Sequence, residues 1–469
     1  MYRYRSGKPD KHSINELFAD YPVIEGVVDQ IYKQGGRAFL VGGAVRDMVL
    51  GLAVHDLDIE VHNLSMDQLA AILRQKGTVS VVGKSFGVLK LYGTPIDWSL
   101  PRSDSAGRKP EVSIDPHMSI TDALRRRDLT MNAMALELHS GEFFDPFQGL
   151  QDIQERVLRS PDLSFFKEDP LRLYRVMQFS GRFEMHPDQA LHEICSTMDI
   201  SQVSQERKEA EFEKLLLYSR RPSIGIRWLS SIGRLSEIAL ELSMTQTVHQ
   251  NPAWHPEGTV FEHLMQAVDA GVLSPVTGDE KLILLYAALC HDLGKISTTI
   301  MKDGVLRSPG HAQEGVFYAR SLLKRITQKT KIIRTVLLLV RYHMEPSHFI
   351  SAGAQLSAYR RLALKLSPYT NLQMLAFLAT ADSRGRNPVG GIPLEAMPDF
   401  IPLFLHRAEQ AQSLVTATMQ ILHGRDINDL VNPGPLMGQL LQYVYEIQLN
   451  EGITDKKLLR DLVIEKLKK

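Results

Sequence analysis

Short runs of β-branched and aromatic residues stop near Leu150, and this change of pattern divides the chain into two kinds of structure. Between residues 38 and 97, the runs AFLV, DIEV, VSVV, GVLKLY and PIDWSL surround one helical segment, residues 66–75, which Ser65 can cap. Beyond Leu150, amphipathic helical patterns continue to the last residue. The sequence therefore predicts an α+β region followed by an all-helical region.

The composition limits the cellular compartments and the classes of binding partner that can be expected. The longest apolar run, residues 282–290, is far shorter than the roughly 20 residues that span a bilayer, and the first residues show no apolar signal segment. Two cysteines, Cys195 and Cys290, cannot form a disulfide framework. We therefore expect a cytoplasmic protein without a membrane partner. Because 54 Lys+Arg balance 54 Asp+Glu, a nucleic-acid partner would need a local basic surface.

Two glycines and two aspartates mark a first candidate site. In FLVGGAVRD, an apolar strand leads into Gly42 and Gly43 and then into a helix from about Ala44. Paired glycines let the backbone approach a ligand and present N–H groups at a helix start, which suits phosphate. In HDLDIEV, Asp56 and Asp58 would lie on one face of a strand, where both carboxylates can share divalent cations. Two exposed aspartates at a strand end are the alternative.

GGAVRD and HDLDIEV together resemble the nucleotidyltransferase signature of the class II tRNA nucleotidyltransferase and bacterial poly(A) polymerase family. Further blocks match in the same order over residues 35–222, namely RRRDLTMNAMAL, DPFQGLQDI, VLRS, KEDPLRLYRVMQFSGRF and ERKEAEFEKLL. The resemblance implies a polymerase β-like head in which Asp56 and Asp58 hold Mg²⁺. It also implies addition of C and A to the 3′ end of tRNA from CTP and ATP, with release of pyrophosphate.

The same resemblance assigns residues to the nucleotide. Gly42 and Gly43 would cradle the triphosphate, and Arg46 would reach a phosphate or pair with Asp47. The other residues placed at nucleotide-contacting positions are Arg127, Asp128, Asn132, Glu168, Asp169, Arg172 and Arg175. Gln178 stands where the family usually has arginine, which removes a positive charge from this helix.

The types of residue in EDPLR explain how two of four bases would be accepted. Cytosine and adenine each present an amino donor beside a ring-nitrogen acceptor, whereas guanine and uracil present the reverse order. A carboxylate only accepts and a guanidinium only donates, so Asp169 with Arg172 fits C and A. The resemblance makes Glu168, Asp169 and Arg172 the amino-acid template. A helix cap by Asp169 before Pro170 is the alternative.

A second candidate site lies in the helical region. HPEGTVFEHLMQ, LLYAALCHDLGK and ATADSRGR resemble the HD metal-dependent phosphohydrolase superfamily, with His263, His291, Asp292 and Asp382 at ligand positions. These ligands would suit a divalent metal, Mg²⁺, Mn²⁺ or Ni²⁺. The resemblance implies a phosphatase or phosphodiesterase acting on 2′-phosphates and 2′,3′-cyclic phosphates. His311 and His343 stand where some HD enzymes place extra ligands or phosphate contacts, and a surface or capped position is the alternative. His255 is expected to be structural or part of a loop.

The predicted architecture is an α+β polymerase β-like nucleotidyltransferase head followed by an all-α neck, an HD domain and a C-terminal helical region. The expected bounds are 1–155 for the head, 156–245 for the neck, 246–390 for the HD domain and 391–469 for a tail that contacts tRNA. Alternative functions are CC-only addition, A-only addition, poly(A) synthesis, or an HD phosphohydrolase whose front half only binds RNA. No residue pattern specifies an oligomeric state.

Overall fold

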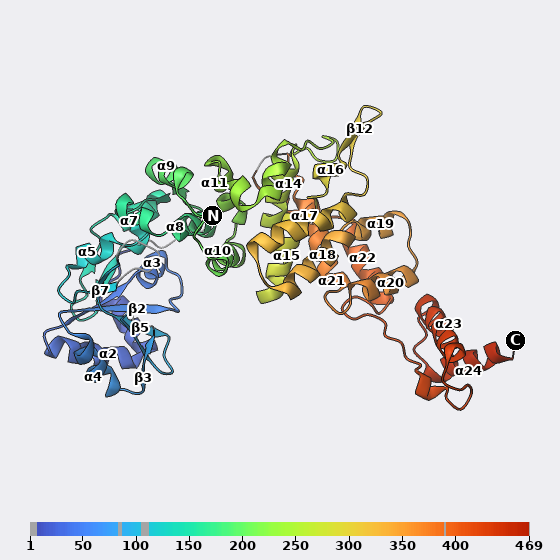
Figure 1. Ribbon diagram of the computed structural model, residues 1–469, viewed down its shortest axis with the longest axis horizontal. Coiled ribbons are helices and arrows are strands. Elements are labelled where there is room, and N and C mark those ends of the chain that lie inside the picture. The colour runs from blue at the N-terminus through green and yellow to red at the C-terminus, as the bar shows by residue number, and fades with distance from the viewer. Residues whose placement is uncertain (1–6, 83–86, 105–111, 389–390, 469) are drawn as a thin grey trace. The chain divides into compact units, whose positions relative to one another are not determined.

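The computed structural model describes residues 7–82, 87–104, 112–388 and 391–468. The chain forms two compact units, Met1–Val203 and Ser204–Lys469 (Figure 1). The first unit contains the main β-sheet and the second is almost entirely helical, so the predicted α+β class with a helical continuation is confirmed. In the described residues, no helix has both the length and the apolar character needed to cross a bilayer. The unit boundary falls inside the segment predicted as the neck, and the four finer bounds stay predictions.

A seven-stranded sheet forms the centre of the first unit. Its strand order is β3 (Val79–Val82), β4 (Val88–Leu91), β5 (Ile96–Ser99), β2 (Leu57–His62), β1 (Arg37–Val41), β8 (Ala135–Glu137) and β9 (Phe143–Phe144). All five predicted runs are strands. Only β2 and β5 pair in parallel, and this pairing sets Asp58 beside Asp97. Leu57 and Ile59 are buried while the intervening Asp58 is exposed, as expected for a strand with one buried face.

Helices complete the first unit. They are α1 (Lys11–Asp20), α2 (Pro22–Lys33), α3 (Gly43–Leu50), α4 (Met66–Arg74), α5 (Ile120–Arg125), η1 (Thr130–Asn132), α6 (Gly149–Glu155), α7 (Leu163–Glu168), α8 (Leu171–Phe183) and α9 (Gln189–Thr197). The predicted cap of α4 is confirmed, because Ser65 Oγ accepts a hydrogen bond from Gln68 N and the Gln68 side chain accepts one from Ser65 N.

Short ladders pair β6 (Arg102–Asp104) with β7 (Val112–Ile114) and β10 (Val157–Leu158) with β11 (His186–Pro187). Residues 105–111, between β6 and β7, lie outside the described residues.

The second unit is built from helices and one hairpin. The elements are α10 (Gln205–Tyr218), α11 (Pro222–Ser231), α12 (Leu235–Ile238), α13 (Leu240–Met244), η2 (Thr245–Thr247), α14 (Val260–Gly271), α15 (Gly278–Cys290), α16 (Lys295–Thr298), β12 (Ile300–Lys302), β13 (Val305–Arg307), α17 (His311–Ile326), α18 (Thr330–Tyr342), α19 (Glu345–Ser351), α20 (Leu356–Leu366), α21 (Leu372–Arg384), α22 (Phe400–Gln410), η3 (Gly424–Asp426), α23 (Pro435–Glu451) and α24 (Lys456–Leu467).

Close backbone contact fixes how α16 meets α17. Helix α15 is packed against α14, α18 and α21, and the chain leaves it through His291, Asp292 and Gly294. A Cβ on Gly294 would collide with the backbone of His311 and Gly315, the first turns of α17. Glycine is therefore required here by close approach of two backbones, which brings the start of α17 beside Asp292.

We expect Gly294→Ala to destabilise the protein by about 1–3 kcal/mol, because the added methyl group forces α16 and α17 apart. Thermal unfolding measures this effect. The matched control is Gly438→Ala in α23, where a Cβ meets nothing within 4 Å, and we expect it to be neutral or stabilising by about 0.5–1 kcal/mol. Unchanged stability of Gly294→Ala would contradict the close-approach argument.

Candidate functional site

Carboxylates gather where β2 begins. Asp56 directly precedes β2 and Asp58 is its second residue; both are exposed, whereas Leu57 and Ile59 are buried. The two aspartates therefore share the open face, as predicted, although the strand itself starts at Leu57. Asp97 in β5 is a further acidic residue of this sheet. The parallel β2–β5 register now sets it beside Asp58, and Lys90 Nζ lies 2.9 Å from Asp97 Oδ1.

Charged side chains of both signs surround Asp58. Although Asp58 keeps contact with solvent, its position in the pocket wall removes part of its hydration, which raises its pKa; the guanidinium of Arg127 opposes that shift, and the carboxylates of Asp97 and Asp56 add to it. The net direction is upward, so ionised Asp58 is disfavoured without a counter-ion. Carboxylate oxygens are hard donors of the kind that Mg²⁺ prefers. A divalent cation fits this donor set because it would supply the missing positive charge.

One pocket of about 350 Å³ joins these carboxylates to the predicted nucleotide-binding residues. Asp58, Asp97, Arg127, Glu168 and Arg172 all line it. The structure therefore brings together residues from β2, β5 and the loop before η1 with the ends of α7 and α8.

Gly42 lies next to this pocket. Its φ is 73°, in the left-handed region, and a Cβ on Gly42 would collide with the guanidinium of Arg127. Only glycine fits both requirements at low cost. Gly43 begins α3, so the two glycines form the expected strand-to-helix turn.

Four of the predicted nucleotide-binding residues form a chain of polar contacts. Arg46 Nη1 donates to Asn132 Oδ1 at 2.8 Å, and Asn132 Nδ2 donates to Asp128 Oδ1 at 3.0 Å. Arg175 Nε donates to Asp128 Oδ2 at 2.5 Å. Arg46 also lies 2.7 Å from Asp47, so the sequence-based alternative of an Arg46–Asp47 pair is present in the structure. These contacts tie α3, η1 and α8 together.

The ionisation state of Asp128 fits this network. Burial alone would raise the pKa of Asp128, but the charge of Arg175 and the hydrogen bonds from Asn132 and Arg175 lower it to about 2. Asp128 therefore stays ionised and anchors its partners. Direct nucleotide contact by Arg46, Asp128, Asn132 and Arg175 stays a prediction, since each already has a protein partner.

The template residues occupy the junction of α7 and α8. Asp169 Oδ1 accepts a hydrogen bond from Leu171 N at 3.1 Å, so the capping role considered from sequence is present. Arg172 donates to the carbonyl oxygens of Phe165 and Arg126 at 2.8 and 2.7 Å, which fixes its guanidinium. Glu168 faces Arg126 at 3.9 Å. A guanidinium already held by two carbonyl groups loses little conformational entropy on binding a base.

Gln178, at the position where the resemblance predicts an arginine, is buried in α8. Its Nε2 finds no hydrogen-bond partner among the described residues. Such a buried donor costs free energy, so a polar partner for it is favourable.

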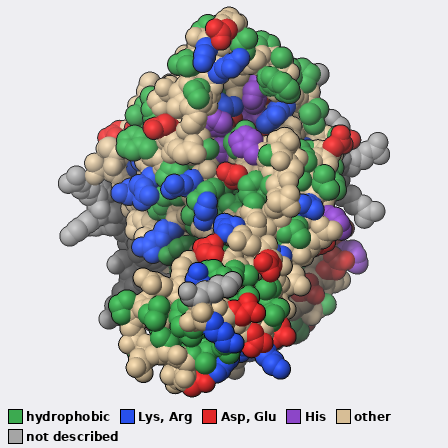
Figure 2. Space-filling view, turned by 90° about the vertical axis from the view of Figure 1, so that its right-hand side faces the viewer, with side chains coloured by type: hydrophobic (Ala, Val, Ile, Leu, Met, Phe, Trp, Pro, Cys, Tyr) green, Lys and Arg blue, Asp and Glu red, His purple; other side chains and the backbone are tan. Residues whose placement is uncertain are grey.

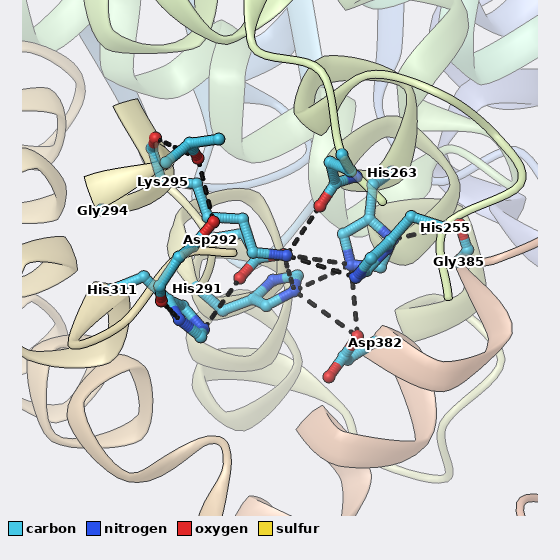
Figure 3. A network of polar contacts seen from close by, with 12 residues as sticks. His255, His263, His291, Asp292, Gly294, Lys295, His311, Asp382 and Gly385 are labelled. Carbon is cyan, nitrogen blue, oxygen red and sulfur yellow. Dashed lines mark hydrogen bonds and ion pairs between the residues drawn. The ribbon is translucent and has the colours of Figure 1, made fainter. Parts of the chain in front are cut away.

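The second candidate site is a buried group of histidines and aspartates from separate helices (Figure 3). His263 comes from α14, His291 and Asp292 follow α15, and Asp382 comes from α21. His263 Nε2 lies 3.1 Å from His291 Nε2, 3.5 Å from Asp292 Oδ2 and 3.2 Å from Asp382 Oδ1. The structure thus gathers all four residues that the sequence singled out as ligands.

Two further histidines face the opposite oxygen of Asp292. His311 Nε2 lies 3.4 Å and His343 Nε2 3.8 Å from Asp292 Oδ1, and the two Nε2 atoms are 3.2 Å apart. Sequence reasoning left both residues open between extra ligands and surface positions. His311 begins α17 and His343 directly follows α18, so the ends of these two helices lie close together at Asp292. Asp292 therefore lies between two groups of nitrogen donors.

The tautomers of these histidines are set by the other ring nitrogen. Nδ1 contacts a backbone carbonyl oxygen in each of the four rings, at distances of 3.2, 2.9, 2.8 and 2.7 Å for His263, His291, His311 and His343 respectively. Donation from Nδ1–H leaves Nε2 with a lone pair. A cation bound between the two Nε2 atoms of a close pair could therefore accept a lone pair from each ring. The donor set fits divalent transition metals.

Protonation follows burial and charge. Burial lowers the pKa of His343 to about 3 and lowers that of His291, which keeps both rings neutral as metal binding requires. Burial also lowers the pKa of His263, but hydrogen bonds with Asp382 and Glu257 outweigh it and raise that pKa to about 9. A metal ion at this position would therefore displace a proton from His263.

A second layer of residues supports the ligands. Glu257 is buried, and its Oε1 lies 2.9 Å from His263 Nδ1 and 2.8 Å from His255 Nδ1. Lys295 Nζ lies 2.7 Å from Asp292 Oδ2, and Arg386 Nη2 lies 2.9 Å from Asp382 Oδ1. Carboxylate partners of this kind orient a metal-binding histidine. Sequence reasoning missed Glu257, whose only signal is its place in HPEG, six residues before His263.

Comparison with known proteins identifies the two domains that carry these sites. Residues 38–159 match the model of the poly A polymerase head domain, and residues 260–379 match the HD domain model. The multifunctional CCA protein of Pasteurella multocida is 31% identical over 364 residues, covering 75% of this chain and 84% of that protein. The multifunctional CCA protein of Haemophilus influenzae is 30% identical over 393 residues, covering 80% and 91%.

Solved structures share the fold at lower identity. The Thermotoga maritima CCA-adding enzyme complexed with tRNA is 17% identical with a TM-score of 0.61, covering 98% of each chain. The Bacillus stearothermophilus CCA-adding enzyme in complex with CTP is 18% identical with a TM-score of 0.62, covering 96% of this chain and 98% of that one.

Fold and sites define a class, a nucleotidyltransferase head joined to an HD domain in one polypeptide. The sequence identity to the two relatives, and the share of each chain that is aligned, identify the family. The chain belongs to the multifunctional CCA protein family.

We expect Asp58→Asn to raise the melting temperature of the metal-free protein at pH 7. The folded-state pKa of Asp58 is raised, so the folded chain binds more protons than the unfolded chain and stability falls as pH rises from about 4. Asparagine does not ionise, so the variant does not lose this stability. The difference in melting temperature between variant and wild type should vanish below about pH 4. Thermal unfolding across pH, with and without Mg²⁺, measures it.

Mg²⁺ should stabilise the wild type and not the variant. The control is Asp461→Asn, which removes an exposed carboxylate in α24 and should be stabilised by Mg²⁺ as the wild type is. A lower melting temperature for metal-free Asp58→Asn at pH 7 would contradict the charge argument.

Proposed function

We propose that the chain adds C and A nucleotides to the 3′ end of tRNA, using CTP and ATP and releasing pyrophosphate. The single observation that supports this best is the pocket that joins Asp58 to Arg127 and Arg172, because it combines a cation site with the base-selecting helix. Family membership supports tRNA as the partner, since the relatives are named CCA proteins. A cytoplasmic location stays a prediction from the cysteine content.

In the proposed reaction, Asp56 and Asp58 would hold Mg²⁺, which when bound stabilises negative charge on the triphosphate. The chain's own contribution is positioning. Gly42 leaves room for Arg127 beside the pocket, and the Arg46–Asn132–Asp128–Arg175 network holds α3 and α8 in place. Asp97 lies close enough to Asp58 to serve as a third carboxylate.

Base choice would follow from Asp169 and Arg172. The fixed guanidinium of Arg172 presents donors, and Asp169 accepts, which matches cytosine and adenine. A buried mismatch costs about 1–3 kcal/mol, so two mismatches would exclude guanine and uracil by several hundredfold.

For the HD domain we propose a metal-dependent phosphatase or phosphodiesterase. His263, His291, Asp292 and Asp382 would hold one divalent ion, and Asp292 with His311 and His343 a second. When bound, such ions act as Lewis acids toward a phosphate oxygen. Mg²⁺, Mn²⁺ and Ni²⁺ are the candidates, and the nitrogen-rich donor set favours the last two.

We expect purified protein with Mg²⁺ to incorporate labelled CTP and ATP, but not GTP or UTP, into tRNA lacking its terminal CCA. Asp58→Ala should reduce incorporation by about 10³-fold or more, because the cation loses a ligand. The control is the double variant His291→Ala with Asp292→Ala, which should retain incorporation and lose phosphatase activity. Persisting incorporation by Asp58→Ala would contradict the site assignment.

Substrates lacking three, two or one of the terminal nucleotides separate the alternatives. Extension of all three to full length supports CCA addition. Acceptance of only the last indicates an A-adding enzyme, and arrest after two additions indicates a CC-adding one. Long A tracts would indicate poly(A) synthesis, and phosphatase activity without any incorporation would favour the RNA-binding-module alternative.

We expect the HD domain to retain two Mn²⁺ ions per chain after desalting in an Asp58→Asn background, measured by elemental analysis. His343→Ala should lower this to about one, because the second ion loses a nitrogen ligand. The control is His348→Ala, an exposed histidine on α19, which should leave the count unchanged. One ion in both the parent and His343→Ala would contradict the second position.

A further inference from the structure

A pocket of about 340 Å³ opens above the HD ligands. Asp292, His311 and Asp382 belong to its lining, so a bound molecule would lie against the metal-binding residues. The volume is at the lower end of the range for small-molecule sites. In the space-filling view, histidine side chains gather on one face close to lysine and arginine side chains (Figure 2). The side chains that line the pocket therefore indicate which class of ligand it binds.

Cations on the walls favour an anion. Lys295 and Arg386 line the pocket and lie against Asp292 and Asp382, where they offset the carboxylate charges. Arg307 at the end of β13 also lines it, and it forms no ion pair with any residue in the described ranges. An unpaired guanidinium beside a metal site is well suited to phosphate.

An exposed tryptophan forms part of the same wall. Trp254 is 69% exposed, whereas Trp98 is fully buried and Trp228 is 7% exposed. Trp254 lines the pocket together with Lys295, Arg307 and Arg386, so a planar ligand in the pocket would cover the indole and bury apolar area. Its flat face matches a planar ring.

The loop that carries Trp254 is held firmly. A β-bridge joins His249 to Thr259, and Trp254 N donates to Asn251 O at 3.1 Å. The neighbouring His255 packs its ring against His263, with ring centroids 5.0 Å apart. The indole is therefore one residue away from a side chain that contacts the metal-binding group.

We infer that Trp254 is the stacking platform for a nucleobase, and that Arg307 binds the phosphate of the same molecule. A phosphorylated nucleoside, either free or at the end of an RNA strand, already follows from the proposed phosphohydrolase function; the new element is the assignment of its two halves to these two residues. Cationic and aromatic groups in one small pocket match the two halves of such a molecule. This inference rests on the proposed phosphohydrolase function and assigns its specificity to residues outside the metal ligands.

The test compares two ligands that share one phosphorus group. The first is adenosine carrying a non-cleavable phosphonate in place of a 2′-phosphate, and the second is methylphosphonate, which lacks the nucleoside. Affinities for the full chain loaded with Mn²⁺ are measured by calorimetry. We expect Trp254→Ala to weaken binding of the adenosine ligand about tenfold, equivalent to about 1.4 kcal/mol, and to leave methylphosphonate unchanged.

Three variants sharpen this result. Trp254→Phe should restore most of the affinity, because a phenyl ring still stacks. Arg307→Met should weaken the binding of both ligands, because Arg307 is proposed to bind the phosphorus group that they share. Phe317→Ala is the matched control, because Phe317 is also 69% exposed and lies outside the pocket lining. The adenosine ligand should also quench tryptophan fluorescence in the wild type but not in Trp254→Phe.

The outcomes separate this inference from the proposed function. Binding of both ligands by the wild type, with the same affinities in Trp254→Ala, overturns the role of Trp254 and leaves the phosphohydrolase proposal intact. Failure of both ligands to bind the wild type overturns the phosphohydrolase proposal and the inference together. A trinucleotide with the same terminal phosphonate identifies the source. Tighter binding than the adenosine ligand supports an RNA end, and equal binding supports a free nucleotide.

Discussion

A carboxylate removed from water needs a positive partner, and both units are organised around that requirement. In the second unit, Asp292 is buried, and its two oxygens face histidines carried by four helices. Burial would raise the pKa of Asp292, yet the charge of Lys295 and the neighbouring imidazoles hold it well below its usual value. The first unit leaves Asp58 undercompensated instead, with a raised pKa. Asp292 therefore stays ionised through its protein neighbours, whereas ionised Asp58 is favoured only when a cation is bound.

The range of an interaction along the chain decides which parts of the structure could be predicted from the sequence. The five strands and the capped helix α4 follow from local patterns, since side-chain alternation and a capping box need only neighbouring residues. The His291–Asp292 pair was recognisable because polar residues interrupt an apolar helix at its end. Strands β8 and β9 were missed because they are too short to show alternation.

Long-range partners could not be obtained in this way. The pairing of Asp58 with Asp97 depends on the parallel register of β2 and β5, and the Arg175–Asp128 contact joins residues 47 positions apart. Glu257 looks like a solvated residue in a Pro/Gly-rich loop, yet it is buried against His263. Asp169 serves a local capping bond that sequence analysis had weighed as an alternative to base selection. Where one side chain could perform two roles, the sequence pattern alone does not decide between them.

The carbonyl oxygens behind the four histidines have an evolutionary consequence. They belong to the main chain, at Gly385, Ala288, Ser308 and Val340, so replacing a neighbouring side chain does not remove them. The imidazoles keep their orientation for as long as the helices keep their course. Descendants of this protein could therefore drift far in sequence around the HD domain, and even exchange one substrate for another, while inheriting a centre still prepared to capture a metal.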